Sequence, residues 1–212
     1  MNIRTFTFNP FQENTYVIYE DNNDCIIVDP GCYTNEEENE LSDFIKSKRL
    51  KPTKLINTHC HIDHVLGNKF VQERWGIDLY INKLEIPILE SANDIAVNYG
   101  FNNYLHCKYP KYFIDEKNII KLNNTYFQIL FTPGHSPGHI CLYNKKENIL
   151  IGGDLIFKES VGRTDLPGGD YNTLIKSIKE KILVLNDKTK IYCGHGSSTT
   201  LKWEKEHNPF LK

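Results

Sequence analysis

The sequence predicts a layered α/β protein in which two β-sheets pack together and helices cover their outer faces. Three observations support this fold class. Strand-like segments open each half of the chain, helix-like segments are interleaved with them, and the two halves follow a similar order. With 212 residues, 40% of them hydrophobic, the chain can bury a substantial core without disulfide or metal support.

The first half of the chain is expected to begin with strands. Residues 2–8 alternate in hydropathy, and residues 25–29 form a short apolar run that ends in an Asp-Pro-Gly turn signal. Residues 35–48 favour a helix, because Leu41 and Ile45 recur at helical spacing in a polar segment. The other elements expected here are strands at 15–19, 54–57 and 78–81, a helix at 67–75, and an irregular region at 84–112.

The second half is expected to repeat this order. Residues 171–185 favour a helix, because apolar side chains at 174, 175, 178, 182 and 185 form one stripe. The other elements expected here are strands at 126–131, 139–143, 148–151 and 190–193, and a terminal helix at 200–207.

Charge and cysteine usage exclude several classes of protein. Lys and Arg total 25 against 27 Asp and Glu, so the net charge of −2 argues against a non-specific nucleic-acid binder. The basic run at 46–51 is expected to mark the end of a helix.

No apolar stretch is long enough to span a membrane, and the N-terminus has no signal-peptide core. The six cysteines are scattered without a Cys-x-x-Cys pair, so we expect reduced core cysteines and a cytoplasmic location.

Histidines and aspartates gather where predicted strands run into loops. In His59-x-His61, two residues apart on an extended segment, both imidazoles can point the same way. Glycines beside several of these positions suit sharp turns that let side chains converge. The candidate ligands are His59, His61, Asp63, His64, His135, Asp154 and His195.

This donor set predicts a catalytic metal centre. Imidazole and carboxylate ligands without cysteine fit Zn, Fe or Mn, whereas structural zinc sites favour cysteine. Seven ligands that include two carboxylates suit two ions better than one. His106, His139 and His207 lack comparable neighbours, and we interpret them as structural.

A serine-nucleophile site is the competing interpretation. The segment Gly134-His135-Ser136-Pro137-Gly138 matches the Gly-x-Ser-x-Gly elbow of serine hydrolases. That elbow needs a backbone N–H donor immediately after the serine, and Pro137 has none. We therefore expect Ser136 to pack or hydrogen-bond locally.

The histidine motif resembles the metallo-β-lactamase superfamily over nearly the whole chain. The resemblance implies a single domain spanning 1–212 with an αββα sandwich, in which two mixed sheets carry helices on their outer faces and the metals lie at one edge. Gly152-Gly153-Asp154 and the closing segment 194–210 resemble the glyoxalase II-like branch, and most closely its short hydroxyacylglutathione hydrolase-like members. The residues that carry the resemblance are Thr58-His59-Cys60-His61-Ile62-Asp63-His64, His135, Asp154 and His195.

Family roles follow from this resemblance, residue by residue. It implies that His59, His61 and His135 bind a first metal, that Asp63, His64 and His195 bind a second, and that Asp154 bridges the two. The ions would be two Zn, with Fe or Mn possible; neither nucleic acid nor a membrane is an expected partner, and protein partners are left open. Asp63 and Asp154 would offset the metal charge and orient a shared hydroxide, which would attack a small-molecule thioester such as S-lactoylglutathione.

Other activities of the same fold stay open. Full-length glyoxalase II has a C-terminal helical domain that supplies part of its glutathione site, whereas only 196–212 follow His195 here. Which thiol carries the acyl group of the substrate is therefore left open. The motifs around His59 and Arg163 also resemble persulfide dioxygenases, which hold one iron at positions matching His59, His135 and Asp154. A lactonase is a further alternative. A class B β-lactamase is less favoured, because those enzymes generally lack an aspartate at position 154.

Two residues outside the motif are candidates for supporting roles. Arg163 follows Asp154 in a loop and could bind a substrate carboxylate, or it could pair with Asp165 or Asp170 to fix that loop. Asp29 could orient a ligating imidazole, or it could serve only as a turn former.

Overall fold

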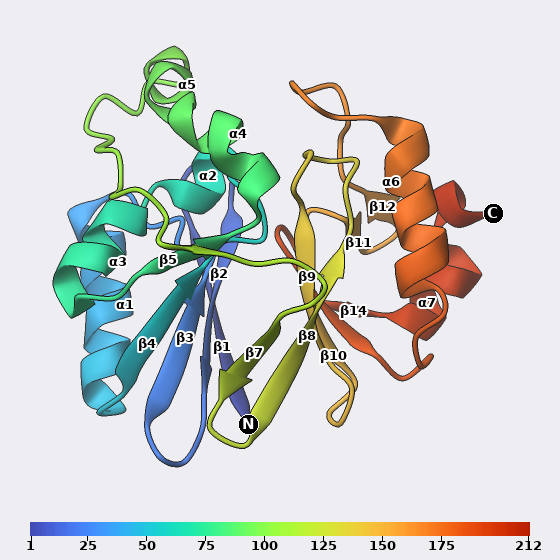
Figure 1. Cartoon of the computed structure of the whole chain (residues 1–212), viewed down its shortest axis with the longest axis horizontal. Coiled ribbons are helices and arrows are strands. Elements are labelled where there is room, and N and C mark those ends of the chain that lie inside the picture. Colours follow the sequence, from blue (N-terminus) through green and yellow to red (C-terminus); the bar gives the residue numbers. More distant parts are fainter. The chain divides into compact units, whose positions relative to one another are not determined.

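The computed structural model describes residues 1–212. The chain divides into two compact units, each built around one six-stranded mixed sheet with helices (Figure 1). The first unit contains Met1–Phe113 and Leu122–Thr125, and the second contains Ile114–Lys121 and Tyr126–Lys212. None of the helices combines the length and the apolar character that a membrane crossing requires.

The first unit is built on a sheet with the strand order β1-β2-β3-β4-β5-β6. The first three strands are antiparallel, and β4, β5 and β6 continue the sheet parallel to β3. The strands are β1 (Asn2–Phe8), β2 (Glu13–Tyr19), β3 (Asp24–Val28), β4 (Lys51–Ile56), β5 (Leu79–Ile81) and β6 (Tyr112–Phe113). The helices are α1 (Asn35–Ser47), α2 (Ile62–Val65), α3 (Asn68–Trp75), α4 (Ile86–Glu90) and α5 (Ala92–Asn98), with a 3₁₀ turn η1 (Lys83–Glu85).

Helix α1 covers one face of this sheet, as the apolar spacing predicts (Figure 1). Its N-cap is Thr34, which forms a reciprocal capping box with Glu37 and satisfies two backbone donors at the N-terminus. Leu41 and Ile45 are buried in the same core cluster as Leu55 of β4. The basic run begins in the last turn of α1, where cations complement the helix dipole.

The region 84–112 is not irregular throughout, so that expectation is wrong. It contains η1, α4 and α5, which are followed by an extended segment that reaches β6. Each helix is too short to be stable by itself, and α4 and α5 instead gain stability by burying Leu89, Ala92 and Ala96 in the core. Leu89, Ala92 and Ala96 stand at helical spacing, but α4 and α5 have only 5 and 7 residues, too short a window for that spacing to identify a helix in the sequence.

The second unit is built on a sheet with the strand order β14-β13-β10-β9-β8-β7. β10 pairs with β13 in parallel, and this pair carries the candidate site. β9 pairs with β10, and β14 with β13, in antiparallel orientation. The strands are β7 (Ile119–Leu122), β8 (Thr125–Phe131), β9 (Ile140–Asn144), β10 (Ile149–Gly153), β13 (Lys190–Cys193) and β14 (Thr199–Thr200), and a small hairpin joins β11 (Ile156–Phe157) to β12 (Ser160–Val161). The helical elements are α6 (Tyr171–Ser177), a π-helical segment η2 (Ile178–Ile182), α7 (Leu201–His207) and a 3₁₀ turn η3 (Pro209–Leu211).

The predicted helix at 171–185 is an α-helix only in its first half. α6 begins at the N-cap Asp170, and the helix then widens into the π-helical segment η2. Leu174, Ile178 and Ile182 are nevertheless all buried in one cluster with Ile191 of β13. The apolar stripe therefore anchors both helical segments to the sheet, and α7 covers the same unit near the C-terminus (Figure 1).

Gly134 lets the loop after β8 approach α6 very closely. Its φ of +132° lies in a region that L side chains rarely adopt, and a Cβ there would collide with the backbone nitrogen of Leu174. The Gly134 carbonyl also accepts a hydrogen bond of 2.8 Å from the Asp170 backbone N–H. The position of His135 therefore depends on a residue without a side chain.

We expect Gly134→Ala to destabilise the protein by about 3 kcal/mol or more, because strain and overpacking add at this position. Gly76→Ala is the matched control, since Gly76 also has a positive φ of +66° but a Cβ added there would have nothing within 4 Å. That variant should cost only about 1 kcal/mol. Urea unfolding of the two variants measures the difference, and equal losses would contradict the close contact with α6.

All six cysteines are buried and none forms a disulfide, in agreement with the core cysteines that the sequence predicts. Burial raises the pKa of the Cys107 thiol to about 11 and of the Cys25 and Cys193 thiols to about 12. Burial also raises the pKa of Cys32 and Cys60 well above the ordinary value. Because the thiolate is the reactive form, these groups are unreactive near neutral pH.

We expect the folded protein to react slowly with an aromatic disulfide reagent at pH 8, because both burial and the raised pKa values suppress the thiolate. In denaturant, all six thiols of the same protein should react with the reagent within minutes. Absorbance of the released thiolate measures both reactions. A fast stoichiometric reaction of the folded protein would contradict the buried placement.

Candidate metal centre

The predicted ligands lie where strands end, in two groups that belong to different units. In the first unit, the segment after β4 carries His59 and His61, and α2 carries Asp63 and His64. In the second unit, His135, Asp154 and His195 follow β8, β10 and β13.

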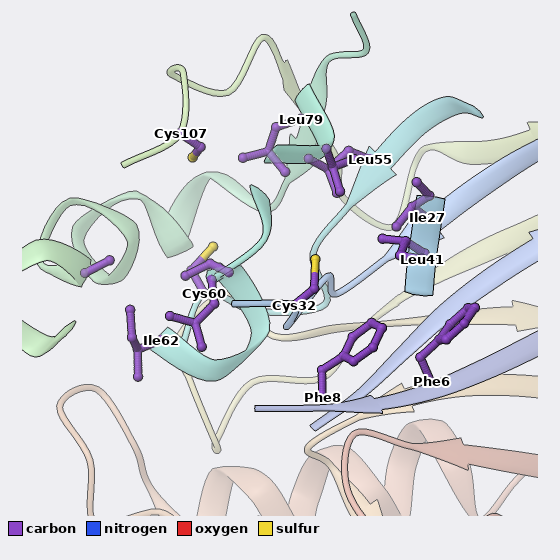
Figure 2. Packing of buried hydrophobic residues seen from close by; sticks show 14 of the residues in the cluster. Phe6, Phe8, Ile27, Cys32, Leu41, Leu55, Cys60, Ile62, Leu79 and Cys107 are labelled. Atoms are coloured by element: carbon purple, nitrogen blue, oxygen red, sulfur yellow. The ribbon is translucent and has the colours of Figure 1, made fainter. Parts of the chain in front are cut away.

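The three imidazoles of the first unit gather around His59. The ring centroid of His59 lies 4.8 Å from that of His61 and 4.1 Å from that of His64. The residues between the ligands turn the other way, because Cys60 and Ile62 belong to the hydrophobic core (Figure 2). The alternation expected for an extended His-x-His segment is therefore present, and the core fixes the segment that carries the ligands.

A chain of hydrogen bonds from Asp29 determines which nitrogen of His59 is available. The Thr58 hydroxyl donates to Asp29 Oδ2 at 2.6 Å, so its only hydrogen is used there. The same hydroxyl lies 3.1 Å from His59 Nδ1 and must therefore accept a hydrogen from it. His59 Nε2 consequently carries the lone pair, which is the form of imidazole that binds a metal.

Asp29 also faces His64, so the supporting role considered for it is consistent with its contacts. His64 Nδ1 lies 3.3 Å from Asp29 Oδ2 and 3.7 Å from Glu13 Oε1. These acidic oxygens favour a hydrogen on Nδ1, which leaves the lone pair on Nε2, 3.7 Å from Asp63 Oδ2. Asp29 is itself held by the Thr58 backbone N–H at 2.7 Å.

Glu13 is a fully buried carboxyl beside this group, and it was not among the residues predicted from the sequence. Burial raises the pKa of Glu13 well above its usual value, and the nearby Asp29 raises it further, whereas His64 lowers it. Its Oε2 accepts a hydrogen bond of 2.9 Å from the Thr15 hydroxyl. Only its place at the start of a buried strand could have drawn attention to it.

The second group is formed by the parallel pairing of β10 with β13. Gly153 pairs with Cys193, and the Gly194 backbone N–H donates to the Gly153 carbonyl at 2.8 Å. The residues that follow these strands, Asp154 and His195, therefore leave the same edge of the sheet side by side.

Asp154 lies midway between two imidazoles. Its Oδ2 is 3.5 Å from His135 Nε2 and also 3.5 Å from His195 Nε2. Two donors at about 2.1 Å from a tetrahedral zinc ion would lie about 3.4 Å apart. The spacing therefore fits donors that share an ion, and the same carboxylate oxygen lies at this distance from both histidines.

His135 is held with its lone pair facing Asp154. Its Nδ1 donates to the Arg163 carbonyl at 2.7 Å, and a carbonyl can only accept, so Nε2 carries the lone pair. Gly162 allows this approach, since a Cβ there would collide with the Asp154 carbonyl oxygen and lie 3.2 Å from His135 Nδ1.

The side chain of Arg163 forms a bidentate ion pair with Asp165, with both N···O distances at 2.7 Å. This contact matches the loop-fixing alternative, and its hydrogen bonds lower the pKa of the exposed Asp165 carboxyl to about 2. A contact of Arg163 with a substrate carboxylate stays a prediction. Asp170 is instead the N-cap of α6.

Ser136 is fully buried, and no helix begins after it, as the argument against a nucleophile elbow requires.

His139 is also fully buried, and its Nε2 accepts a 3.1 Å hydrogen bond from the Asp154 backbone N–H. The interpretation of His139 as structural therefore missed a contact with a candidate ligand, which only the pairing of distant loops reveals.

The donor set of both groups fits divalent ions. His59 and His135 present Nε2 lone pairs because hydrogen-bond acceptors hold their Nδ1 hydrogens, and the acidic oxygens beside His64 Nδ1 favour the same form. Two carboxylates, Asp63 and Asp154, lie next to those imidazoles and would offset positive charge. Imidazole with carboxylate is a combination that Zn, Fe and Mn accept.

We expect Thr58→Val to weaken zinc binding about 10-fold or more, because the variant breaks the path from Asp29 to His59 Nδ1. Thr58→Ser keeps the hydroxyl and should bind zinc nearly as the wild type does. Competition with a chromophoric chelator measures the dissociation constants. Equal affinity of the Val and Ser variants would show that the hydroxyl does not hold the imidazole.

Comparison with known proteins identifies the family to which this fold belongs. The family model of the metallo-β-lactamase superfamily matches residues 8–195. Hydroxyacylglutathione hydrolase GloC of Haemophilus influenzae is 37% identical over 212 residues, which cover 100% of this chain and 98% of that protein.

Solved structures agree over the full length. The crystal structure of the B3 metallo-β-lactamase BLEG-1 has a TM-score of 0.90 and 33% identity and covers 100% of both chains. The structure of TTHA1623 in a di-iron-bound form has a TM-score of 0.87 and 34% identity, covering 98% of this chain and 100% of that one. The chain therefore belongs to the metallo-β-lactamase superfamily, as its histidine motif predicts, and is a metallohydrolase of that fold.

Proposed function

We propose that this protein hydrolyses thioesters, with a hydroxyacyl thioester of the S-lactoylglutathione type as the substrate. The observation that carries the proposal is the carboxylate of Asp154, whose Oδ2 lies at equal distances from two imidazole nitrogens. An aspartate at this position distinguishes the sequence from class B β-lactamases, which generally lack one, and is shared with the persulfide dioxygenases. The identity of 37% with a hydroxyacylglutathione hydrolase supports the same branch.

We propose that two ions are bound, most simply zinc, with iron or manganese as other candidates. His59, His61 and His135 would hold the first, Asp63, His64 and His195 the second, and Asp154 both. The lone-pair assignments of His59 and His135 support this proposal, as do the acidic neighbours that favour the same form of His64. A relative of 34% identity with a di-iron form is the reason to include iron.

The residues of the chain have distinct tasks in the proposed reaction. A bound divalent ion would supply Lewis acidity, which lowers the pKa of water and stabilises negative charge on a carbonyl oxygen. His59, His64 and His135 would present their Nε2 lone pairs to the ions, and Asp63 and Asp154 would offset the positive charge. A thiol leaving group with a pKa of about 8.5 departs as the thiolate, so the chain needs no strong acid beside it.

Arg163 is the proposed contact for a substrate carboxylate. Its guanidinium is exposed and already engaged with Asp165, and the bidentate geometry is one that a substrate carboxylate could adopt in exchange. The Arg163 carbonyl, in contrast, is committed to His135. Side chain and backbone of this residue would therefore serve different parts of the reaction.

Two alternatives have a specific basis. Hydrolysis of β-lactams is suggested by the likeness to a B3 metallo-β-lactamase at 33% identity. A persulfide dioxygenase with one iron is suggested by the motifs around His59 and Arg163. Lactones are a third possible substrate class.

The deciding experiment combines elemental analysis with a panel of thioesters, lactones, β-lactams and persulfides. We expect about two ions per chain and fastest turnover of a hydroxyacyl thioester. Asp154→Ala should reduce this turnover at least about 100-fold, because it removes a carboxylate shared by two ligand sets. Asp187→Ala is the matched control, since that aspartate is exposed and its side chain pairs with Lys205 in a surface ion pair.

Three results would contradict the proposal. Asp154→Ala could turn over thioester as the wild type does, which would remove the assigned role of this carboxylate. One iron per chain with oxygen uptake on a thiol persulfide would support the dioxygenase instead. Preferential turnover of a β-lactam would place the protein functionally with the B3 enzymes. Circular dichroism of both variants verifies that the fold is retained.

A further inference from the structure

His139 is a buried imidazole that contacts the main chain of Asp154 and lies outside the ligand set assigned above. We propose that His139, together with Thr132, is a positioning residue that fixes the main chain of Asp154 and thereby the metal affinity of the site. The inference rests on the proposed metal centre and extends it to a pair of residues that the histidine motif does not include. Both residues belong to the second unit, as does Asp154.

The direction of each hydrogen bond follows from chemistry. The Asp154 backbone N–H can only donate, so His139 Nε2, 3.1 Å away, must accept and carries no hydrogen. The ring hydrogen is therefore on Nδ1, which donates to the Thr132 hydroxyl at 2.9 Å. Thr132 in turn donates its backbone N–H to the His139 carbonyl at 2.9 Å, so the two residues bind each other twice.

Asp154 needs this acceptor because the sheet does not provide one. The register between β10 and β13 shifts between Ile151 and Gly153, and Gly153 has a positive φ of +49°. An irregularity of this kind ends ladder pairing and redirects the next side chain. The backbone N–H of Asp154 therefore leaves the ladder in a buried place, and His139 replaces the missing strand partner.

The other side of the same residue is closed by the loop at Gly162. A Cβ at Gly162 would collide with the Asp154 carbonyl oxygen. The Asp154 main chain is thus fixed through its N–H by a hydrogen bond and on its carbonyl side by close contact. This double constraint holds Oδ2 at 3.5 Å from each of two imidazoles.

His139 is not itself a ligand. Both of its ring nitrogens are engaged, one by Asp154 and the other by Thr132, and its ring lies 6.1 Å from that of His135 at 89°. Its residue type matters because an imidazole offers an acceptor and a donor on opposite sides in one rigid ring. An amide can replace only one of these two contacts at a time.

The test uses this difference between amides. His139→Gln can place an amide oxygen near the position of Nε2 and keep the acceptor for Asp154, whereas the shorter His139→Asn can reach only the Thr132 side. We expect the Gln variant to bind zinc within about threefold of the wild type and the Asn variant to bind about 10- to 100-fold more weakly, the range for partners that orient metal ligands. His207→Gln is the matched control, since His207 is exposed and its ring contacts Trp203 of the C-terminal helix.

The measurements are zinc dissociation constants by chelator competition, ions per chain after dialysis, and thermal unfolding of the metal-free variants. Equal zinc affinity of the Asn variant and the wild type would overturn the role of His139, as would an equal loss in Gln and Asn variants of unchanged metal-free stability. If the Asn variant fails to fold, Thr132→Val tests the same chain of contacts, and wild-type affinity in that variant would overturn the role of Thr132. Absence of zinc or iron binding by the wild type would instead overturn the proposed metal centre, and with it this inference.

Discussion

The arrangement of this protein depends on one constraint, which is that a neutral imidazole can present a lone pair on only one nitrogen. A candidate histidine ligand can therefore offer the lone pair of one ring nitrogen to a metal only if a hydrogen-bond acceptor holds the hydrogen on the other ring nitrogen. The structure meets this requirement with a threonine hydroxyl for His59 and a main-chain carbonyl for His135, and acidic oxygens near His64 Nδ1 favour the same form there. The loops that look irregular in the sequence are shaped by these acceptors.

The fold class and most elements could be predicted, because both depend on local patterns. The run at 2–8 forms β1 with the predicted bounds, and the helix expected at 35–48 differs from α1 by one residue at its end. The placement of the candidate ligands after β4, β8, β10 and β13 also follows from the sequence, because apolar runs end visibly before the polar motifs. Strand ends of one sheet meet at one edge, so the proximity of Asp154 and His195 follows from the β10–β13 pairing.

The features that escaped prediction depend on contacts between distant segments. Helices α4 and α5 have only 5 and 7 residues and are stabilised by the core, so the helical spacing of their buried residues is not a clear signal in the sequence. His139 is four positions from His135, and its bond to Asp154 becomes visible only when β9 and β10 are paired. Glu13 begins β2, and nothing in its neighbours indicates that it lies beside His64. Asp29 is a candidate for a supporting role in the sequence, with a turn former as the alternative, but only the folded chain identifies its partners.

The concentration of acidic oxygen around His64 has a consequence for how the protein survives in the cell. Glu13, Asp29 and Asp63 all approach this one imidazole, and burial raises the pKa of Glu13 and so favours its neutral form. A cation taken up there would gain oxygen ligands that only the folded chain brings together, and it would act as a ligand of the native state alone. Supply of the ion would then govern how long each newly made molecule resists proteolysis, as well as whether it turns over substrate.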